Sequence, residues 1–231
     1  MRVFLLVLLC FVMSCEDKQS SKQKNIDKID STSVKKEEKK QKKPKRKYPR
    51  LTDNNAMTFL GKYADEHPEN KVRIVTDFGD IDILLYDKTK YHRANFIFLA
   101  EQDYFDYTQF YRVVPNFVIQ GGSSDGIDIA NRRRKIGRYL LPPDTKRGYT
   151  HKRGAISMPS SEIEDAYKLA SPYQFFIVNR KGGAPFLDGD YTVFGEVIKG
   201  MDVVDKINAV ETDKGEWPLK NVFIKSVEII E

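Results

Sequence analysis

FYRVVPNFVIQGG, residues 110–122, is the most informative stretch of this sequence. Its β-branched and aromatic residues predict two short strands, and Pro115-Asn116 between them predicts a turn. Arg112 lies inside the first strand, and Gln120 ends the second. A charged side chain among core residues usually has a partner or a task. We therefore treat Arg112 and Gln120 as candidate functional residues.

The flanking sequence predicts more strands and two helices. Residues 72–76 and 80–86 surround an Asp77-Phe78-Gly79 turn, and the second run alternates polar with apolar residues, which predicts a β-hairpin. Apolar-rich helices are expected at 94–100 and 201–207, and a last strand at 222–230. Further upstream, the spacing of apolar residues in 54–66 predicts an amphipathic helix that ends at His67-Pro68. Closely spaced strands with few helices suggest a closed barrel.

Four motifs follow one another in an order that resembles the cyclophilins, the peptidyl-prolyl cis-trans isomerases. Residues 110–122 resemble the family signature, in which Phe-His-Arg leads through a Pro to Phe-x-x-Gln-Gly-Gly. The other three motifs are 154–158 (GAISM), 174–177 (QFFI) and 186–189 (FLDG), the last running on to 193–195 (VFG). The resemblance implies a mainly β domain over residues 71–231: a closed eight-stranded antiparallel barrel capped by two helices. Residues 51–70 would add an N-terminal helical extension.

The resemblance also implies an activity and its residues. Rotation about an X-Pro bond is slow because amide resonance must be broken, so catalysis needs a dry proline pocket and a donor to the imide nitrogen, without a metal or cofactor. By position, Arg112 matches the catalytic donor, and Gln120 matches the residue that holds its guanidinium. Substrate-binding positions are Phe117, Val118, Pro159, Ser160, Gln174, Phe176, Phe186, Leu187 and Tyr191.

Residue type alone supports plainer interpretations of the same side chains. Phe117, Phe176 and Leu187 have the character of barrel core, and Arg112 that of a surface charge on an edge strand. The order of the motifs favours the functional interpretation in each case.

The sequence departs from the family pattern around the expected groove. Phe186 replaces a Trp and so lacks an indole N–H, which argues against strong cyclosporin binding. Tyr191 stands where many members have His, and Pro159-Ser160 replaces Ala-Asn. Residues 161–173 form a longer segment than is usual, with an acidic start. We expect these changes to affect the grip on substrate more than the chemistry.

The first fifteen residues predict a secretory signal. The apolar run 3–12 is too short to span a membrane permanently. Cys15 after Ser14 resembles a bacterial lipobox, so we expect a signal peptide over 1–15 and a lipid on Cys15; the alternative is an ordinary cleavage site with an incidental Cys. The expected location is the bacterial cell envelope, where the exported protein is lipid-anchored to a membrane.

Residues 16–50 differ in composition from the rest of the chain. They contain fourteen Lys or Arg and six Asp or Glu, with almost no large apolar residue, which predicts a disordered basic tether. Residues 51–231 hold 24 basic and 27 acidic residues, a net charge of 24 − 27 = −3. This balance argues against nucleic acid as a partner of the folded part.

Three other features favour structural interpretations. Residues 121–126 (GGSSDG) are expected to form a turn, because the Lys-Ser/Thr and helix of a phosphate loop do not follow. The basic run from Arg132 to Arg138 is interpreted as a solvated loop. His67, His92 and His151 lack ligand spacing, so no metal site is expected.

The combined prediction is an isomerase that accelerates rotation of X-Pro bonds in exported proteins by an Arg-assisted, non-covalent mechanism. An alternative is a module or chaperone that binds proline-containing segments with little turnover. A third is a structural envelope protein with a vestigial pocket.

Overall fold

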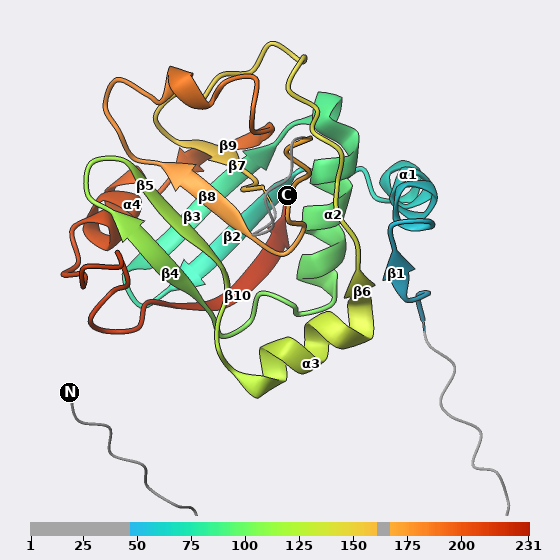
Figure 1. Cartoon of the computed structure of the whole chain (residues 1–231), viewed down its shortest axis with the longest axis horizontal. Coiled ribbons are helices and arrows are strands. Elements are labelled where there is room, and N and C mark those ends of the chain that lie inside the picture. The colour runs from blue at the N-terminus through green and yellow to red at the C-terminus, as the bar shows by residue number, and fades with distance from the viewer. Residues whose placement is uncertain (1–46, 161–166) are drawn as a thin grey trace, which may run out of the picture. The chain divides into compact units, whose positions relative to one another are not determined.

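A closed β-barrel forms the centre of the folded part (Figure 1). The computed structural model describes residues 47–160 and 167–231. Neighbouring barrel strands are antiparallel throughout, in the order β10-β2-β3-β9-β7-β8-β5-β4. The strands are β2 (Lys71–Thr76), β3 (Gly79–Leu85), β4 (Thr108–Val114), β5 (Val118–Ser123), β7 (Ala155–Ser157), β8 (Phe175–Val178), β9 (Val193–Lys199) and β10 (Phe223–Ile230). The predicted eight-stranded antiparallel barrel is confirmed.

Alternation along the strands fills the barrel interior. In β2, Val72 and Ile74 are fully buried, whereas Arg73 between them faces outward and forms an ion pair of 2.7 Å with Asp82 of β3. Phe110 and Phe175 are also fully buried in the same core. A small barrel filled by side chains has no room for a ligand inside, so a substrate must bind on the outer surface.

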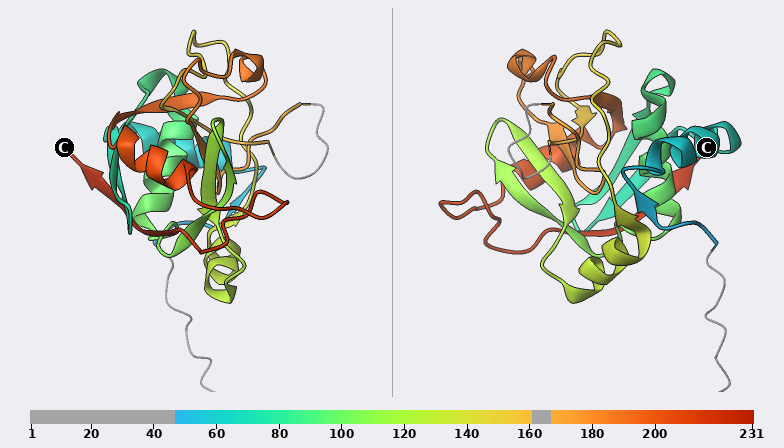
Figure 2. Two further views of the ribbon diagram at one scale, coloured as in Figure 1. Left: turned by 90° about the vertical axis from the view of Figure 1, so that its left-hand side faces the viewer. Right: turned by 45° about the vertical axis from the view of Figure 1, so that its right-hand side comes forward.

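Four α-helices accompany the barrel in the described residues. Figure 1 shows α2 and α4 on opposite sides of the barrel, with α1 outside α2, and the two views of Figure 2 agree. The helices are α1 (Ala56–Glu66), α2 (Lys90–Glu101), α3 (Ile127–Ile136) and α4 (Met201–Asn208), and two short 3₁₀ helices are η1 (Asp87–Thr89) and η2 (Pro185–Leu187). The helices predicted at 54–66, 94–100 and 201–207 are confirmed.

The prediction of a solvated loop at 132–138 was wrong, because helix α3 covers residues 132–136. Ile129 and Ile136 are the buried residues of this helix, and two apolar contacts in ten residues give too weak a periodicity to recognise. Arg132 fastens the helix by donating hydrogen bonds to the carbonyl oxygens of Asp103 (2.6 Å) and Asp106 (2.7 Å). The turn predicted at 121–126 was also wrong in part, because residues 121–123 end strand β5 and only 124–126 form the link, which leads directly into α3.

A two-stranded parallel sheet joins the N-terminal extension to the end of α3. It consists of β1 (Leu51–Thr52) and β6 (Gly137–Arg138). Gly137 has a φ of +147°, and a Cβ atom there would lie 2.0 Å from the Leu51 carbonyl oxygen. Only glycine fits this close approach. Residues 51–70 are thus a strand plus a helix, where the sequence predicted only the helix.

Several predictions concern residues outside the described ranges. The expected signal peptide, Cys15, most of the tether and residues 161–166 of the long acidic segment lie there. Among the described helices, none combines the length and apolar character needed to cross a membrane.

Candidate active site

A bulge in β4 places Arg112 on the outer face of the barrel. The register of β4 against β5 shifts between Phe110 and Arg112, so one extra residue, Tyr111, is accommodated there. Phe110 and Val113 are fully buried, whereas Tyr111 and Arg112 are both partly exposed. A bulge of this kind turns two consecutive side chains to one side of the sheet. Both therefore face Gln120, which pairs with Arg112 across the two strands.

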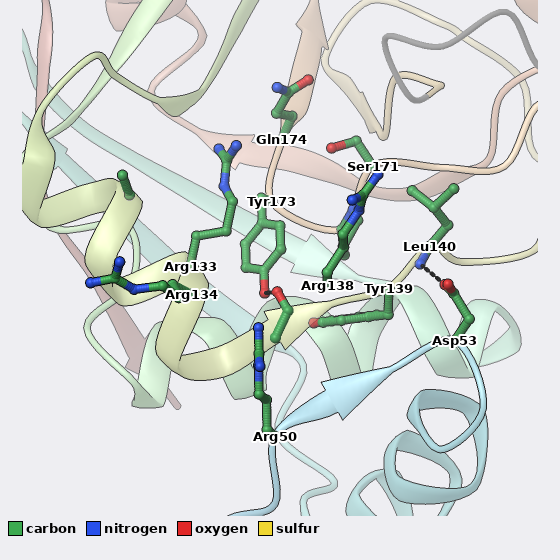
Figure 3. Close-up of a pocket in the computed structure, with 13 residues that line it drawn as sticks. Arg50, Asp53, Arg133, Arg134, Arg138, Tyr139, Leu140, Ser171, Tyr173 and Gln174 are labelled. Atoms are coloured by element: carbon green, nitrogen blue, oxygen red, sulfur yellow. Dashed lines mark hydrogen bonds between the residues drawn. The ribbon is translucent and has the colours of Figure 1, made fainter.

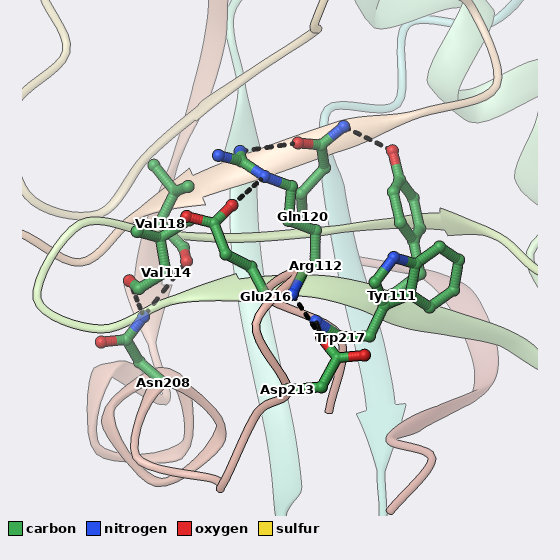
Figure 4. Close-up of polar contacts among 10 residues, drawn as sticks. Tyr111, Arg112, Val114, Val118, Gln120, Asn208, Asp213, Glu216 and Trp217 are labelled. Carbon is green, nitrogen blue, oxygen red and sulfur yellow. Dashed lines mark hydrogen bonds and ion pairs between the residues drawn. The ribbon is translucent and has the colours of Figure 1, made fainter. Parts of the chain in front are cut away.

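Four side chains form a continuous polar chain on this surface (Figure 4). The Arg112 Nε donates to Oε2 of Glu216 at 2.7 Å, and Nη1 donates to Oε1 of Gln120 at 3.3 Å. The Gln120 amide in turn donates from Nε2 to the Tyr111 hydroxyl. The guanidinium is thus held from two directions, by a carboxylate and by an amide that is itself held.

The remaining guanidinium donors face outward. The Arg112 and Glu216 side chains keep 38% and 40% of their surface exposed, so water screens this ion pair. Nη2 has no hydrogen-bond acceptor within the described ranges. It is therefore available to a ligand that enters the adjoining pocket.

A pocket of about 290 Å³ opens beside Arg112. Its apolar wall belongs to a cluster outside the barrel core, which includes Val118 and Phe176 as buried members and Phe117, Leu187 and Tyr191 as partly buried ones. Phe117, Phe176 and Leu187 are therefore not part of the barrel interior. The complete lining is Arg112, Phe117, Val118, Gln120, Pro159, Ser160, Phe176, Phe186, Leu187 and Tyr191.

The β4–β5 turn carries part of this wall and is held by α4. Asn116 at the tip has a φ of +57°, a left-handed conformation that asparagine tolerates. Asn208, at the end of α4, donates to the carbonyl oxygens of Val114 (2.9 Å) and Val118 (3.1 Å), and its side-chain oxygen accepts from the Asn116 N–H (2.8 Å). Figure 4 shows the two contacts to the carbonyl oxygens. The Asn208 amide therefore fixes the position of Phe117 through three hydrogen bonds, two donated and one accepted.

The opposite wall is held through His151. Its Nδ1 lies 2.6 Å from Oδ1 of Asp188, the residue after Leu187, and its Nε2 lies 3.1 Å from the Ser157 hydroxyl. Its ring also stacks on Phe176 with the centroids 5.8 Å apart. Burial lowers the pKa of His151, and the neighbouring Asp188 carboxylate opposes that shift. His151 thus connects the η2 segment to the barrel. Within the described ranges it belongs to no group of side chains that could hold a metal ion.

Ten of the eleven predicted site residues meet in this one pocket; Gln174 does not. Gln174 lines a separate, larger cavity next to it. Two contributors escaped the sequence argument, Glu216 and Tyr111. Glu216 comes from a loop more than a hundred positions further along the chain, so no local pattern points to it. Tyr111 adjoins Arg112, but only the bulge brings the two to one face.

Comparison with known proteins identifies this combination of barrel and surface pocket. Residues 71–229 match the family described as cyclophilin type peptidyl-prolyl cis-trans isomerase. The chain belongs to this family. By membership it is a cyclophilin-type peptidyl-prolyl cis-trans isomerase, and the family predicted from the motifs is confirmed.

Several cyclophilin relatives are similar over the same region. A peptidyl-prolyl cis-trans isomerase of Acinetobacter baylyi is 36% identical over 166 residues, which cover 68% of this chain and 84% of the relative. Peptidyl-prolyl cis-trans isomerase-like 2 of Rhizopus delemar is 32% identical, but the match covers only 30% of that longer protein. A crystal structure of a Cryptosporidium parvum cyclophilin type isomerase superposes with a TM-score of 0.58 at 25% identity, covering 71% of this chain and 98% of that one. A second structure of that protein was obtained in the presence of the dipeptide Ala-Pro, at 26% identity and the same TM-score.

The cyclophilin site contains no obvious place for a metal. Within the described ranges, no three His, Cys, Asp or Glu side chains gather closely enough to hold an ion.

Proposed function

We propose that this cyclophilin accelerates rotation of X-Pro bonds by an Arg-assisted, non-covalent mechanism. The observation that carries the proposal is the open Nη2 group of Arg112 beside an apolar pocket of about 290 Å³. A proline ring fits the character of this pocket, because its walls are aromatic and aliphatic.

The mechanism uses binding that strengthens as the bond twists. In the planar imide the nitrogen lone pair is delocalised, and at the twisted geometry it is localised and accepts a hydrogen bond. Arg112 donates to it at that point, while Phe117, Phe176 and Leu187 hold the ring away from water. The uncatalysed barrier is ~18–20 kcal/mol, and each ~1.4 kcal/mol removed from it is a tenfold gain in rate.

Gln120 and Glu216 act by holding the guanidinium. A single long side chain on a surface samples several rotamers, and two acceptors on different atoms restrict it to one direction. The substrate then meets a donor that is already oriented.

The test is a comparison of turnover with binding. The full chain in a mild detergent is mixed with a short Ala-Pro peptide, and the cis–trans exchange rate is measured by NMR alongside the dissociation constant. Acceleration at catalytic protein concentration supports the isomerase. Saturable binding without acceleration would replace it with the proline-segment binding module, and absence of both would favour a vestigial pocket.

We further propose that the protein is exported, anchored to a membrane through a lipid on Cys15, and acts on exported polypeptides in the bacterial cell envelope. The support is the sequence alone: the apolar run, the Ser14-Cys15 junction and the basic segment after it. Mass spectrometry of the protein from bacterial membranes should find an acylated N-terminal Cys15. In Cys15→Ser the protein should move to the soluble fraction; unchanged membrane association would reject the anchor.

A further inference from the structure

A second cavity is about twice as large as the proline pocket and adjoins it at the Pro159-Ser160 segment. Its volume is about 570 Å³. Its floor contains the rings of Tyr139 and Tyr173, whose hydroxyl groups are already bonded inside the protein, to Asn95 (2.6 Å) and to the Gly137 carbonyl oxygen (2.7 Å). The tyrosines are thus structural, and the groups left to recognise a ligand are elsewhere in the lining.

Four arginines line this cavity, which we call the arginine pocket. They are Arg50, Arg133, Arg134 and Arg138. Figure 3 shows Arg133 and Arg138 on either side of the Tyr173 ring, with Arg50 approaching from the start of β1 and Arg134 pointing away. The one acidic residue of the lining, Asp53, is engaged: its carboxylate accepts the Leu140 N–H at 3.0 Å.

The four arginines of the arginine pocket outnumber its single carboxylate, that of Asp53. Within residues 47–160 and 167–231, none of its four arginines forms an ion pair, whereas Arg73, Arg112, Arg147 and Arg153 each pair with a carboxylate elsewhere on the domain. Three of the four arginines lie within residues 51–231, whose net charge is −3. Arginines gathered around a concave, partly apolar surface favour an anionic ligand, because the guanidinium fork matches a carboxylate.

The two cavities share a wall. Pro159 and Ser160 line the proline pocket, and Ser171 of the arginine pocket donates its N–H to the Pro159 carbonyl oxygen at 2.9 Å. On the neighbouring segment, Gln174 lines the arginine pocket and Phe176 the proline pocket. Side chains two residues apart on an extended segment point to one face and lie about 7 Å apart. An extended peptide with its proline beside Phe176 therefore reaches the arginine pocket within about two residues.

We propose that the arginine pocket binds an acidic side chain of the same polypeptide whose proline occupies the neighbouring pocket. This inference rests on the proposed function. It defines the substrate class as segments with Glu or Asp a short, fixed distance from the proline. The Pro159-Ser160 wall, where the sequence departs from its family, separates the two subsites.

The test uses alanine-based peptides that hold one proline and one glutamate, with the glutamate moved through every position on both sides. Matched peptides carry glutamine instead. For the full chain, the dissociation constant and kcat/KM of the cis–trans exchange are measured for each pair. We expect one position, about two residues from the proline, at which glutamate improves binding and kcat/KM about tenfold over glutamine.

Arg50→Gln/Arg138→Gln is the decisive variant. Both side chains are exposed, so the fold should survive. Lys62→Gln/Lys88→Gln removes the same charge from exposed positions away from the cavity and serves as the control. The basic segment at 16–50 is otherwise unchanged in all proteins. The glutamate preference should disappear in the arginine variant and persist in the control.

Each other outcome has a distinct meaning. Equal values for glutamate and glutamine peptides at every position, or a preference that survives in Arg50→Gln/Arg138→Gln, would overturn the acidic subsite. So would an arginine-dependent affinity for vesicles of anionic lipid in the absence of any glutamate effect. The glutamine peptides report the proposed isomerase by themselves: if none is accelerated while glutamate still strengthens binding through the arginines, the isomerase fails and the subsite stands.

Discussion

Glu216 orients Arg112 without taking part in the substrate pocket itself. Its backbone is fixed independently, because its carbonyl oxygen accepts the Val113 N–H at 2.8 Å. A change of its side chain should therefore leave the loop in place. Since more than a third of each side chain in the ion pair is exposed to water, its contribution to the free energy of unfolding should be below about 1 kcal/mol.

We predict that Glu216→Gln lowers kcat/KM for an Ala-Pro peptide by about three- to tenfold, because the guanidinium loses its charged acceptor and samples more orientations. Urea unfolding should change by less than about 1 kcal/mol. Glu211→Gln, in the same loop, provides the control. A Glu216→Gln protein as active as Glu211→Gln would show that Gln120 alone orients Arg112.

The sequence motifs predicted most of the residues that line the pocket. They did not predict the residues that reach the site through a long-range contact or a strand bulge. Arg112, Gln120 and the pocket walls were predicted from the motifs that the sequence shares with the family. Glu216 and Tyr111 do not, because a distant loop and a strand bulge decide their positions. Gln174 was assigned to substrate binding with the others, and its side chain lies in the arginine pocket. The roles themselves remain predictions.

Among the elements, the β4–β5 turn depends on α4 through Asn208. This side chain is 4% exposed and makes all three of its hydrogen bonds to the turn backbone. Its loss would remove a partner from two carbonyl oxygens and one N–H, although the Val114 oxygen would keep the Phe117 N–H at 3.0 Å. Unsatisfied buried polar groups are costly.

Asn208→Ala should therefore reduce the free energy of unfolding by about 2–3 kcal/mol. Its KM for an Ala-Pro peptide should rise, because Phe117 lies on the released turn. Asn208→Asp keeps the acceptor for Asn116 but places a carboxylate oxygen against both carbonyl oxygens, so its stability should be no higher than that of the alanine variant. Urea denaturation of the three proteins checks the order, and equal stability of all three would show that the turn holds itself.

Some helices and strands have too few regularly spaced apolar residues to be predicted from the sequence. The barrel hairpin and helices α1, α2 and α4 have enough apolar residues at regular spacing to be predicted. Helix α3 buries only Ile129 and Ile136, and the β1–β6 pair has two residues per strand. Both are fixed by contacts from elsewhere: Arg132 on distant carbonyl oxygens, and Gly137 against Leu51.

The whole molecule carries a buried histidine that links its stability to pH. His92 on α2 is 1% exposed, and neither ring nitrogen has a hydrogen-bond partner within the described ranges. Burial lowers its pKa from 6.5 to about 4, with Asp144 opposing weakly. Between these values the unfolded chain binds a proton that the folded protein excludes. Stability is therefore lost as the pH falls through this range.

We predict that this one group removes about 3 kcal/mol of unfolding free energy between about pH 7.5 and pH 4. In His92→Leu the side chain cannot bind a proton. The unfolding free energy of this variant should therefore fall by about 3 kcal/mol less than that of the wild type over the same pH range. The difference between the two urea-unfolding curves at each pH isolates His92 from the carboxylates that titrate in both. Parallel pH profiles would contradict a depressed pKa.

Catalysis by Arg112 can be tested with one rate measurement. NMR exchange of an Ala-Pro peptide with the full chain is compared for the wild type, Arg112→Ala and Arg147→Ala, the last removing another surface arginine that pairs with a carboxylate. With unfolding unchanged, we predict that kcat/KM falls about 10²–10³-fold in Arg112→Ala and stays near wild type in Arg147→Ala. A folded Arg112→Ala protein that retains the wild-type rate would contradict Arg-assisted isomerisation.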